Sequence, residues 1–255
     1  ASAESMFYSQ ASYCFSANLR LRELQLENFT DERLEALAGD VRAAIAASAK
    51  KLDERRLTTF TDLQTKAIVD ERLREAAEYV AADNVSSRDV AYAMERYRSG
   101  IIWSNFFELP GERLQLDDVH LKRACEAKLS EVEERKGYLS FLFGSPLVDE
   151  QELSAAYEMY AEGDYALCLF KATKAKAQVD MVISSIAMAE RDLPSLVEEK
   201  LAVAKVIIDR ETRSDRFPIM GYSYYEYAGS LQEEDPYVAA LFASYALELG
   251  DLSLY

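Results

Sequence analysis

The chain has 255 residues, with 29 basic and 45 acidic side chains, one His and a formal net charge of −16. This balance disfavours nucleic-acid binding, because a protein that binds the phosphate backbone needs a surface of Lys and Arg. Hydrophobic residues make up 49% of the chain, whereas Gly and Pro number only nine and five. Such a chain can bury a large core and is rich in helix-forming residues, so we predict an all-α fold.

Apolar residues recur at steps of three and four through most of the chain, as at Leu34, Leu37, Val41 and Ile45. This spacing places one apolar stripe on each helix, and no segment alternates convincingly with the period of a strand. We therefore predict about ten helices and no sheet. In chain order the expected helices span 4–28, 31–57, 62–82, 87–107, 117–142, 149–162, 164–189, 194–212, 218–232 and 236–250.

Several of these helix starts carry residues that can cap them. Thr61 with Gln64 has the pattern of a capping box, in which two side chains satisfy free backbone N–H groups reciprocally, and Ser86 with Asp89 is a looser version. Asp235-Pro236 combines a capping side chain with proline at the first helical position. These patterns predict the amino-terminal ends of three helices.

The strongest break in the chain is at Gly144 and Pro146. Glycine is suited to the end of a helix, and proline disfavours helical backbone at the residue before it. We therefore predict two parts, 1–145 with long helices and 146–255 with shorter ones, packed together as one helical unit.

The second part contains a repeat-like pattern. Gly163-Asp164-Tyr165 predicts a tight turn between two helices, and Asp235-Pro236-Tyr237 follows a second tyrosine-rich helix 72 residues further on. Alanines follow each turn and allow two helix backbones to approach closely. This interval is about two tetratricopeptide units, so we predict long antiparallel helices followed by tetratricopeptide-like hairpins. Any antiparallel helix pair with an Ala-rich seam gives the same pattern, and this alternative stays open.

The segment 7–18, Phe-Tyr-Ser-Gln-Ala-Ser-Tyr-Cys-Phe-Ser-Ala-Asn, resembles the (Y)YSAxSxxFxAN element of archaeal Lon-like serine proteases. In that family the element lies in a helical region that follows the protease domain. The protease motif Pro-Ser-Ala-Gly is absent from this chain, so no catalytic residue carries over. The resemblance implies a non-catalytic helical appendage that is extracytoplasmic or membrane-associated. The chain also begins without Met, and we expect it to be a piece of a longer protein.

Signatures of common enzyme classes are missing from the sequence. The single histidine, His120, excludes HExxH zinc sites and paired Glu-x-x-His sites, which need at least two. There is no G-x-S-x-G elbow and no glycine-rich phosphate loop. His120 follows Asp117-Asp118 at a predicted helix start, where we expect a surface residue. We predict no catalytic residue, no cofactor and no metal ligand.

Tyrosines are the best candidates for a binding surface. Their large contact area and polar tip suit them to peptide recognition, although tyrosines at helical spacing also serve in the packing of helix pairs. The candidate interaction surface consists of Tyr222, Tyr224, Tyr225, Tyr227, Tyr237 and Tyr245.

The three cysteines, Cys14, Cys125 and Cys168, lie far apart among apolar neighbours and form no CxxC pair. We expect buried thiols rather than a disulfide framework or a zinc ribbon. No stretch has the roughly 20 apolar residues of a membrane-spanning helix.

Two glycosylation sequons begin at Asn28 and Asn84. Their hydroxyl residues, Thr30 and Ser86, precede predicted helices, and helix capping accounts for them without modification. If the sequons are used, the chain lies outside the cell membrane.

The main hypothesis is a non-enzymatic helical protein-interaction or scaffolding domain, appended to a Lon-like archaeal protease. Its partner would be a protein or peptide, including its own protease domain, and a homo-oligomer is compatible with the sequence. The alternative is a stand-alone helical bundle that binds a metal ion or small ligand through carboxylates and tyrosines. A purely structural spacer is a third option.

Overall fold

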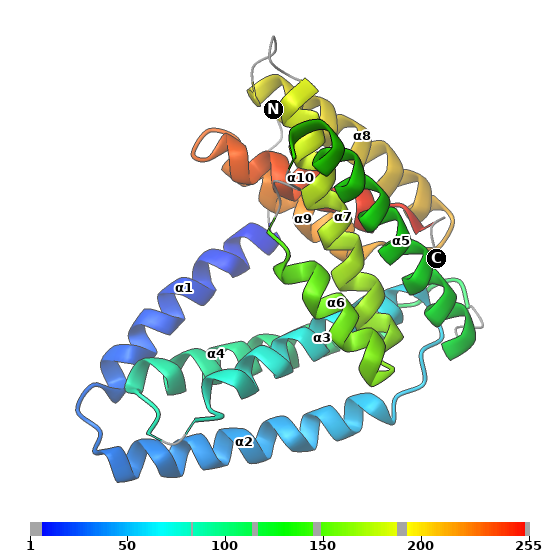
Figure 1. Cartoon of the computed structure of the whole chain (residues 1–255). Coiled ribbons are helices and arrows are strands. Elements are labelled where there is room, and N and C mark those ends of the chain that lie inside the picture. The colour runs from blue at the N-terminus through cyan, green and yellow to red at the C-terminus, as the bar shows by residue number, and fades with distance from the viewer. Residues whose placement is uncertain (1–6, 83, 114–116, 145–148, 188–192, 253–255) are drawn as a thin grey trace. The chain divides into compact units, whose positions relative to one another are not determined.

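A computed structural model describes residues 7–82, 84–113, 117–144, 149–187 and 193–252, with side chains except at 7–13 and 187 (Figure 1). Within these ranges the chain forms ten α-helices and one 3-10 helix and has no strand, so the predicted all-α class is confirmed. Contacts divide the chain into a smaller unit, 10–57 with 65–108, and a larger unit, 1–9 with 58–64 and 109–255. The predicted boundary at 145/146 lies outside the described residues.

The smaller unit is built around the apolar stripe of its second helix. Leu34, Val41 and Ile45 are buried, and the helix that carries them packs against α4. The second helix ends at Asp53, four residues before its predicted end at 57. In the segment that follows, the Arg55 guanidinium lies over the ring of Phe107, 4.1 Å from the ring centroid. The elements that contribute to this unit are α1 (Phe7–Leu26), α2 (Asp31–Asp53), α3 (Phe60–Tyr79), α4 (Ser87–Trp103) and η1 (Ser104–Glu108).

Both sequon hydroxyls cap helices. The Thr30 side chain accepts a hydrogen bond from the backbone N–H of Arg33 at the start of α2. Ser86 and Asp89 form a complete capping box at the start of α4, as predicted. Asn28 and Asn84 are themselves exposed. Capping therefore explains Thr30 and Ser86 structurally, while both Asn side chains remain accessible.

The predicted capping box of Thr61 and Gln64 is wrong. α3 begins at Phe60, and its start is held by Asp62, whose carboxylate accepts the backbone N–H of both Thr58 and Thr59. A charged carboxylate accepts hydrogen bonds from backbone N–H groups more strongly than a neutral amide such as that of Gln64 does. Gln64 instead donates to the Leu249 carbonyl at 2.8 Å and accepts the Met220 N–H at 3.1 Å, while Thr61 donates to the Phe217 carbonyl. The first turn of α3 is thus tied into the larger unit.

The larger unit contains six further helices, which are α5 (Asp118–Phe143), α6 (Gln151–Glu162), α7 (Tyr165–Ala187), α8 (Leu193–Arg213), α9 (Ile219–Leu231) and α10 (Pro236–Gly250). α7 is central, because α5, α6 and α10 all pack against it (Figure 1). Gly144 and Gly163 adopt left-handed backbone at the ends of α5 and α6, and Asp235 caps α10, all as predicted.

α9 and α10 approach each other through small residues. Ala228 on α9 and Ala239, Ala240, Ala243 and Ala246 on α10 are all fully buried. At one end of this seam a Cβ on Gly221 would lie 2.5 Å from the Gly250 Cα. The backbones are therefore closer here than any residue larger than glycine allows.

The cysteine prediction is wrong in two respects. Cys14 is exposed rather than buried. Cys125 and Cys168 are buried, but they are joined in a disulfide that links α5 to α7, with their Cα atoms 6.0 Å apart. The pairing escaped sequence analysis because the partners are 43 residues apart and meet only when α5 packs on α7.

Candidate binding groove

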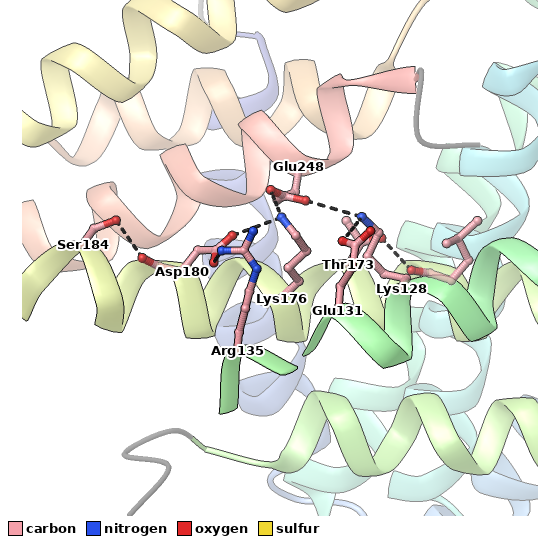
Figure 2. A network of polar contacts seen from close by, with 9 residues as sticks. Lys128, Glu131, Arg135, Thr173, Lys176, Asp180, Ser184 and Glu248 are labelled. Carbon is pink, nitrogen blue, oxygen red and sulfur yellow. Dashed lines mark hydrogen bonds and ion pairs between the residues drawn. The ribbon is translucent and has the colours of Figure 1, made fainter. Parts of the chain in front are cut away.

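A network of ion pairs connects α5, α7 and α10 in the larger unit (Figure 2). Lys128 on α5 has a side chain only 3% exposed, and its ammonium group lies 2.9 Å from Glu131 and 3.8 Å from Glu248 on α10. A lysine buried to this extent requires a carboxylate partner, because an unpaired charge in the interior is strongly destabilising. The two glutamates provide that partner.

Lys176 on α7 continues the network. Its ammonium group pairs with Glu248 and lies 3.1 Å from a carboxylate oxygen of Asp180. The other oxygen of Asp180 pairs with Arg135 on α5. Figure 2 shows these side chains pointing toward one another from three helices. Asp180 and Glu248 thus share Lys176, and each has a second cation as well.

A pocket of about 240 Å³ opens beside this network. Its lining comprises Arg135, Asp180 and Glu248 from the network, apolar groups such as Ile183, and Lys200 from α8. Burial lowers the pKa of Lys200, an effect that the charges of Asp180 and Glu248 partly offset and the charge of Lys176 reinforces. Among the residues that the structure describes, no carboxylate lies within 4.0 Å of the Lys200 ammonium group.

A second hollow, of about 380 Å³, adjoins the first. It is lined by Glu131, Glu134, Arg135 and Tyr138 of α5 and by Ile183 of α7. Arg135 and Ile183 belong to both hollows, so the two lie next to each other beside α5 and α7. We call the two adjacent hollows together the α5–α7 groove.

Apolar side chains extend the groove along α5. Tyr138 is 55% exposed and Phe141 is 85% exposed, and Leu142 and Phe143 follow at nearly half exposure. Glu134, Tyr138 and Phe141 are spaced by four and three residues, so they share one helix face. Exposed aromatic side chains that continue a hollow are typical of interaction sites rather than of ordinary surface.

Three of the six tyrosines predicted to form a binding surface lie in an aromatic cluster between α9 and α10. Tyr224, Tyr227 and Tyr245 surround Phe242, with ring centroids 4.9 to 5.9 Å from the Phe242 ring. Tyr245 is only 4% exposed, and its hydroxyl accepts a hydrogen bond from Gln178. The cluster packs α9 against α10.

The other three predicted tyrosines point elsewhere. The Tyr222 hydroxyl donates to Glu226, and its ring packs on Phe217. Tyr225 packs against the buried core formed by α7, α8, α9 and α10. Tyr237 is 58% exposed at the start of α10. The structure does not gather the six onto one face, and whether their exposed edges bind a partner stays a prediction.

The groove and the ion pairs beside it escaped sequence analysis, although one signal pointed to buried ion pairs on α7. Lys171, Lys174 and Lys176 interrupt the most apolar part of α7, and each is paired with an acidic residue. Lysines within an apolar helix indicate buried ion pairs, since such a helix has little solvent-facing surface. The pairing itself depends on Glu152 and Glu248, which are distant in the sequence.

His120 is exposed beside the capping residue Asp117, as expected, and it holds the pKa of that carboxyl below its ordinary value. Within the described ranges, no group of three or more His, Cys, Asp or Glu side chains is arranged to hold a metal ion. None of the helices in the described part of the chain is long and apolar enough to cross a membrane.

No family model, curated protein or solved structure matches the chain.

Proposed function

We propose that the chain is a non-enzymatic helical protein-interaction domain and that it binds a segment of its partner in the α5–α7 groove. One observation carries the proposal. A hollow of about 380 Å³ is continued along α5 by Tyr138 and by Phe141, which is 85% exposed. Tyrosine and phenylalanine beside a hollow supply the anchors on which protein interfaces depend.

The charges of the groove favour a basic partner. Glu131 and Glu134 line its α5 wall, and the whole chain carries a net charge of −16. A partner segment with Arg or Lys beside an aromatic or aliphatic anchor complements both features. Opposite charges increase the rate of encounter and select the orientation of the bound segment.

The proposal also includes the type of helical architecture, which two pairs of consecutive helices support. α6 and α7 pack together across the turn at Gly163, and α9 and α10 pack across the turn at Asp235. We interpret both pairs as antiparallel, tetratricopeptide-like hairpins, in keeping with their Ala-rich seams. Arrays of this kind present grooves to peptide segments.

The parent protein remains a separate proposal, which rests on the resemblance of residues 7–18 to the helical region of archaeal Lon-like proteases. The Cys125–Cys168 disulfide supports an oxidising compartment, as an extracytoplasmic appendage requires. The upstream gene sequence tests this directly. A Lon-type domain with its own Ser-Lys pair supports the appendage, whereas a start codon immediately before residue 1 contradicts it.

Selection from a library of random heptapeptides with free carboxyl ends tests the groove. We expect selected peptides to be rich in Arg, Lys and aromatic residues. Tyr138→Ala should weaken their binding about tenfold or more, as for an interface anchor. Tyr79→Ala is the control, because it removes an exposed tyrosine that belongs neither to the groove nor to the six tyrosines of the candidate surface.

Dissociation constants from fluorescence polarisation compare the two variants. Equal loss in both variants, no loss in Tyr138→Ala, or failure of the selection to yield any binding peptide would overturn the proposal. Far-ultraviolet circular dichroism of both variants checks that the helical fold is retained.

A further inference from the structure

Among the described residues, one cation in the lining of the pocket at the α8 end of the groove has no ion-pair partner. Asp180 pairs with Arg135 and Lys176. Glu248 pairs with Lys176 and lies 3.8 Å from Lys128, which also has Glu131 at 2.9 Å. Lys200 completes the lining, yet no carboxylate of the described residues lies within 4.0 Å of it. The group in this pocket that lacks an opposite charge is therefore positive.

The size and the lining of the pocket restrict what can approach Lys200. At about 240 Å³ the pocket is smaller than the cavities that hold drug-sized molecules, so it suits a group of a few atoms. Ala177, Ile183 and Leu247 contribute apolar wall. An ion pair formed against such walls is less screened by water than one on an open surface.

From this arrangement we infer that Lys200 receives a carboxylate of the bound segment, most directly the carboxyl terminus of a partner peptide. The inference rests on the proposed function for the identity of the occupant. A basic segment lying along Glu131 and Glu134 would then end at Lys200, with its last carboxylate in the pocket. Capture of a C-terminal carboxylate is a recurrent mode of peptide recognition.

An incoming ammonium group fits the same pocket less well. Asp180 and Glu248 are already bridged by Lys176, so a further cation would meet Lys200, Lys176 and Arg135 at close range. A carboxylate instead gives Lys200 the partner that its half-buried position lacks. Since burial lowers the pKa of Lys200, a bound carboxylate should raise that pKa toward its ordinary value.

Small probes test the pocket without any partner protein. N-acetylglycine imitates a peptide carboxyl terminus, and N-acetylglycinamide is its uncharged equivalent. N-acetylglutamic acid α-amide carries only a side-chain carboxylate. It therefore distinguishes binding of an acidic side chain from binding of a chain terminus. Nuclear magnetic resonance of ¹³C-dimethylated lysines follows each addition, and the Lys200 signal is assigned from its absence in Lys200→Met.

We expect N-acetylglycine to shift the Lys200 signal saturably and to raise its pKa, with N-acetylglycinamide inactive. Lys200→Arg should retain binding, whereas Lys200→Met should weaken it about tenfold, as loss of a charge-assisted hydrogen bond does. The control is Lys205→Met, which removes the same charge from an exposed position on α8.

The inference is overturned if the Lys200 signal does not move, or moves equally with the amide. Stronger binding of N-acetylglutamic acid α-amide than of N-acetylglycine overturns the carboxyl-terminal assignment. These outcomes are distinct from failure of the groove. If Tyr138→Ala leaves peptide binding intact while N-acetylglycine still reaches Lys200, then the groove proposal fails and the carboxylate pocket stands.

Discussion

Gly221 allows a sharp test of the packing between α9 and α10. A Cβ at this position would lie 2.5 Å from the Gly250 Cα and 2.7 Å from the Gly250 nitrogen, whereas ordinary contact begins near 3.4 Å. The obstructing atoms are backbone, so no side-chain rotation relieves the overlap. In Gly221→Ala the two helices must therefore move apart by about 1 Å, a gap that forfeits a quarter to a half of the dispersion energy between the atoms concerned.

The expected loss of stability follows from two opposing effects. Overpacking of this kind costs about 1–3 kcal/mol and occasionally more, and the separation also loosens the fully buried alanine seam. Alanine is the better helix former by about 1 kcal/mol, which offsets part of this cost. We expect Gly221→Ala to lower the free energy of unfolding by about 1–2 kcal/mol.

Gly137 on α5 provides the matched control, because a Cβ there would meet nothing within 4 Å. Gly137→Ala should raise the free energy of unfolding by about 0.5–1 kcal/mol relative to the native protein. Urea unfolding followed by circular dichroism compares the two variants, and fluorescence of the single tryptophan, Trp103, reports on the smaller unit separately. A Gly221→Ala protein as stable as the native protein would refute the close approach of the two helices.

Three further predictions concern the larger unit. Cys168→Ala should lower the free energy of unfolding by about 2–4 kcal/mol, because the disulfide closes a long loop; alkylation of both cysteines in the unreduced, unfolded protein would contradict the pairing. Gln64→Ala should cost about 2 kcal/mol in urea unfolding, because it leaves two buried backbone groups unpaired, whereas the exposed Gln151→Ala should change stability by less than about 0.5 kcal/mol. Because burial lowers the pKa of Lys200, the unfolded chain binds more protons between the folded value and 10.5, so stability should rise with pH there. Lys200→Met should flatten that rise, and an unchanged slope measured by urea unfolding across this range would contradict the burial of its charge.

Helix positions were largely predictable because their signals are local. The capping box at Ser86 and the left-handed glycines at 144 and 163 lie within a few residues of the helix ends that they define. α10 begins and ends at the predicted residues, after Asp235 and Pro236. The start of α3 was misplaced because Thr61 and Gln64 have a capping pattern but serve other contacts. Thr61 binds the Phe217 carbonyl in the segment before α9, and Gln64 binds backbone groups of α9 and α10.

The candidate site was hardly predictable at all. Sequence analysis chose tyrosines on α9 and α10, and the fold uses three of them to pack these helices around Phe242. A tyrosine at a helical position is compatible with either role, and only the neighbouring helix decides between them. The groove instead depends on α5 and on lysines that attracted no attention as isolated residues.

The sequence by itself therefore determined the all-α class, most helix boundaries and the acidic surface, because periodicity, caps and net charge depend on residues near one another or on composition alone. The tertiary structure decided which charges pair with one another. Lys176 meets Glu248 across 72 residues, and Gln64 meets the Leu249 carbonyl across 185. Such contacts form only when helix packing brings distant segments within a few ångströms, and no local pattern specifies them.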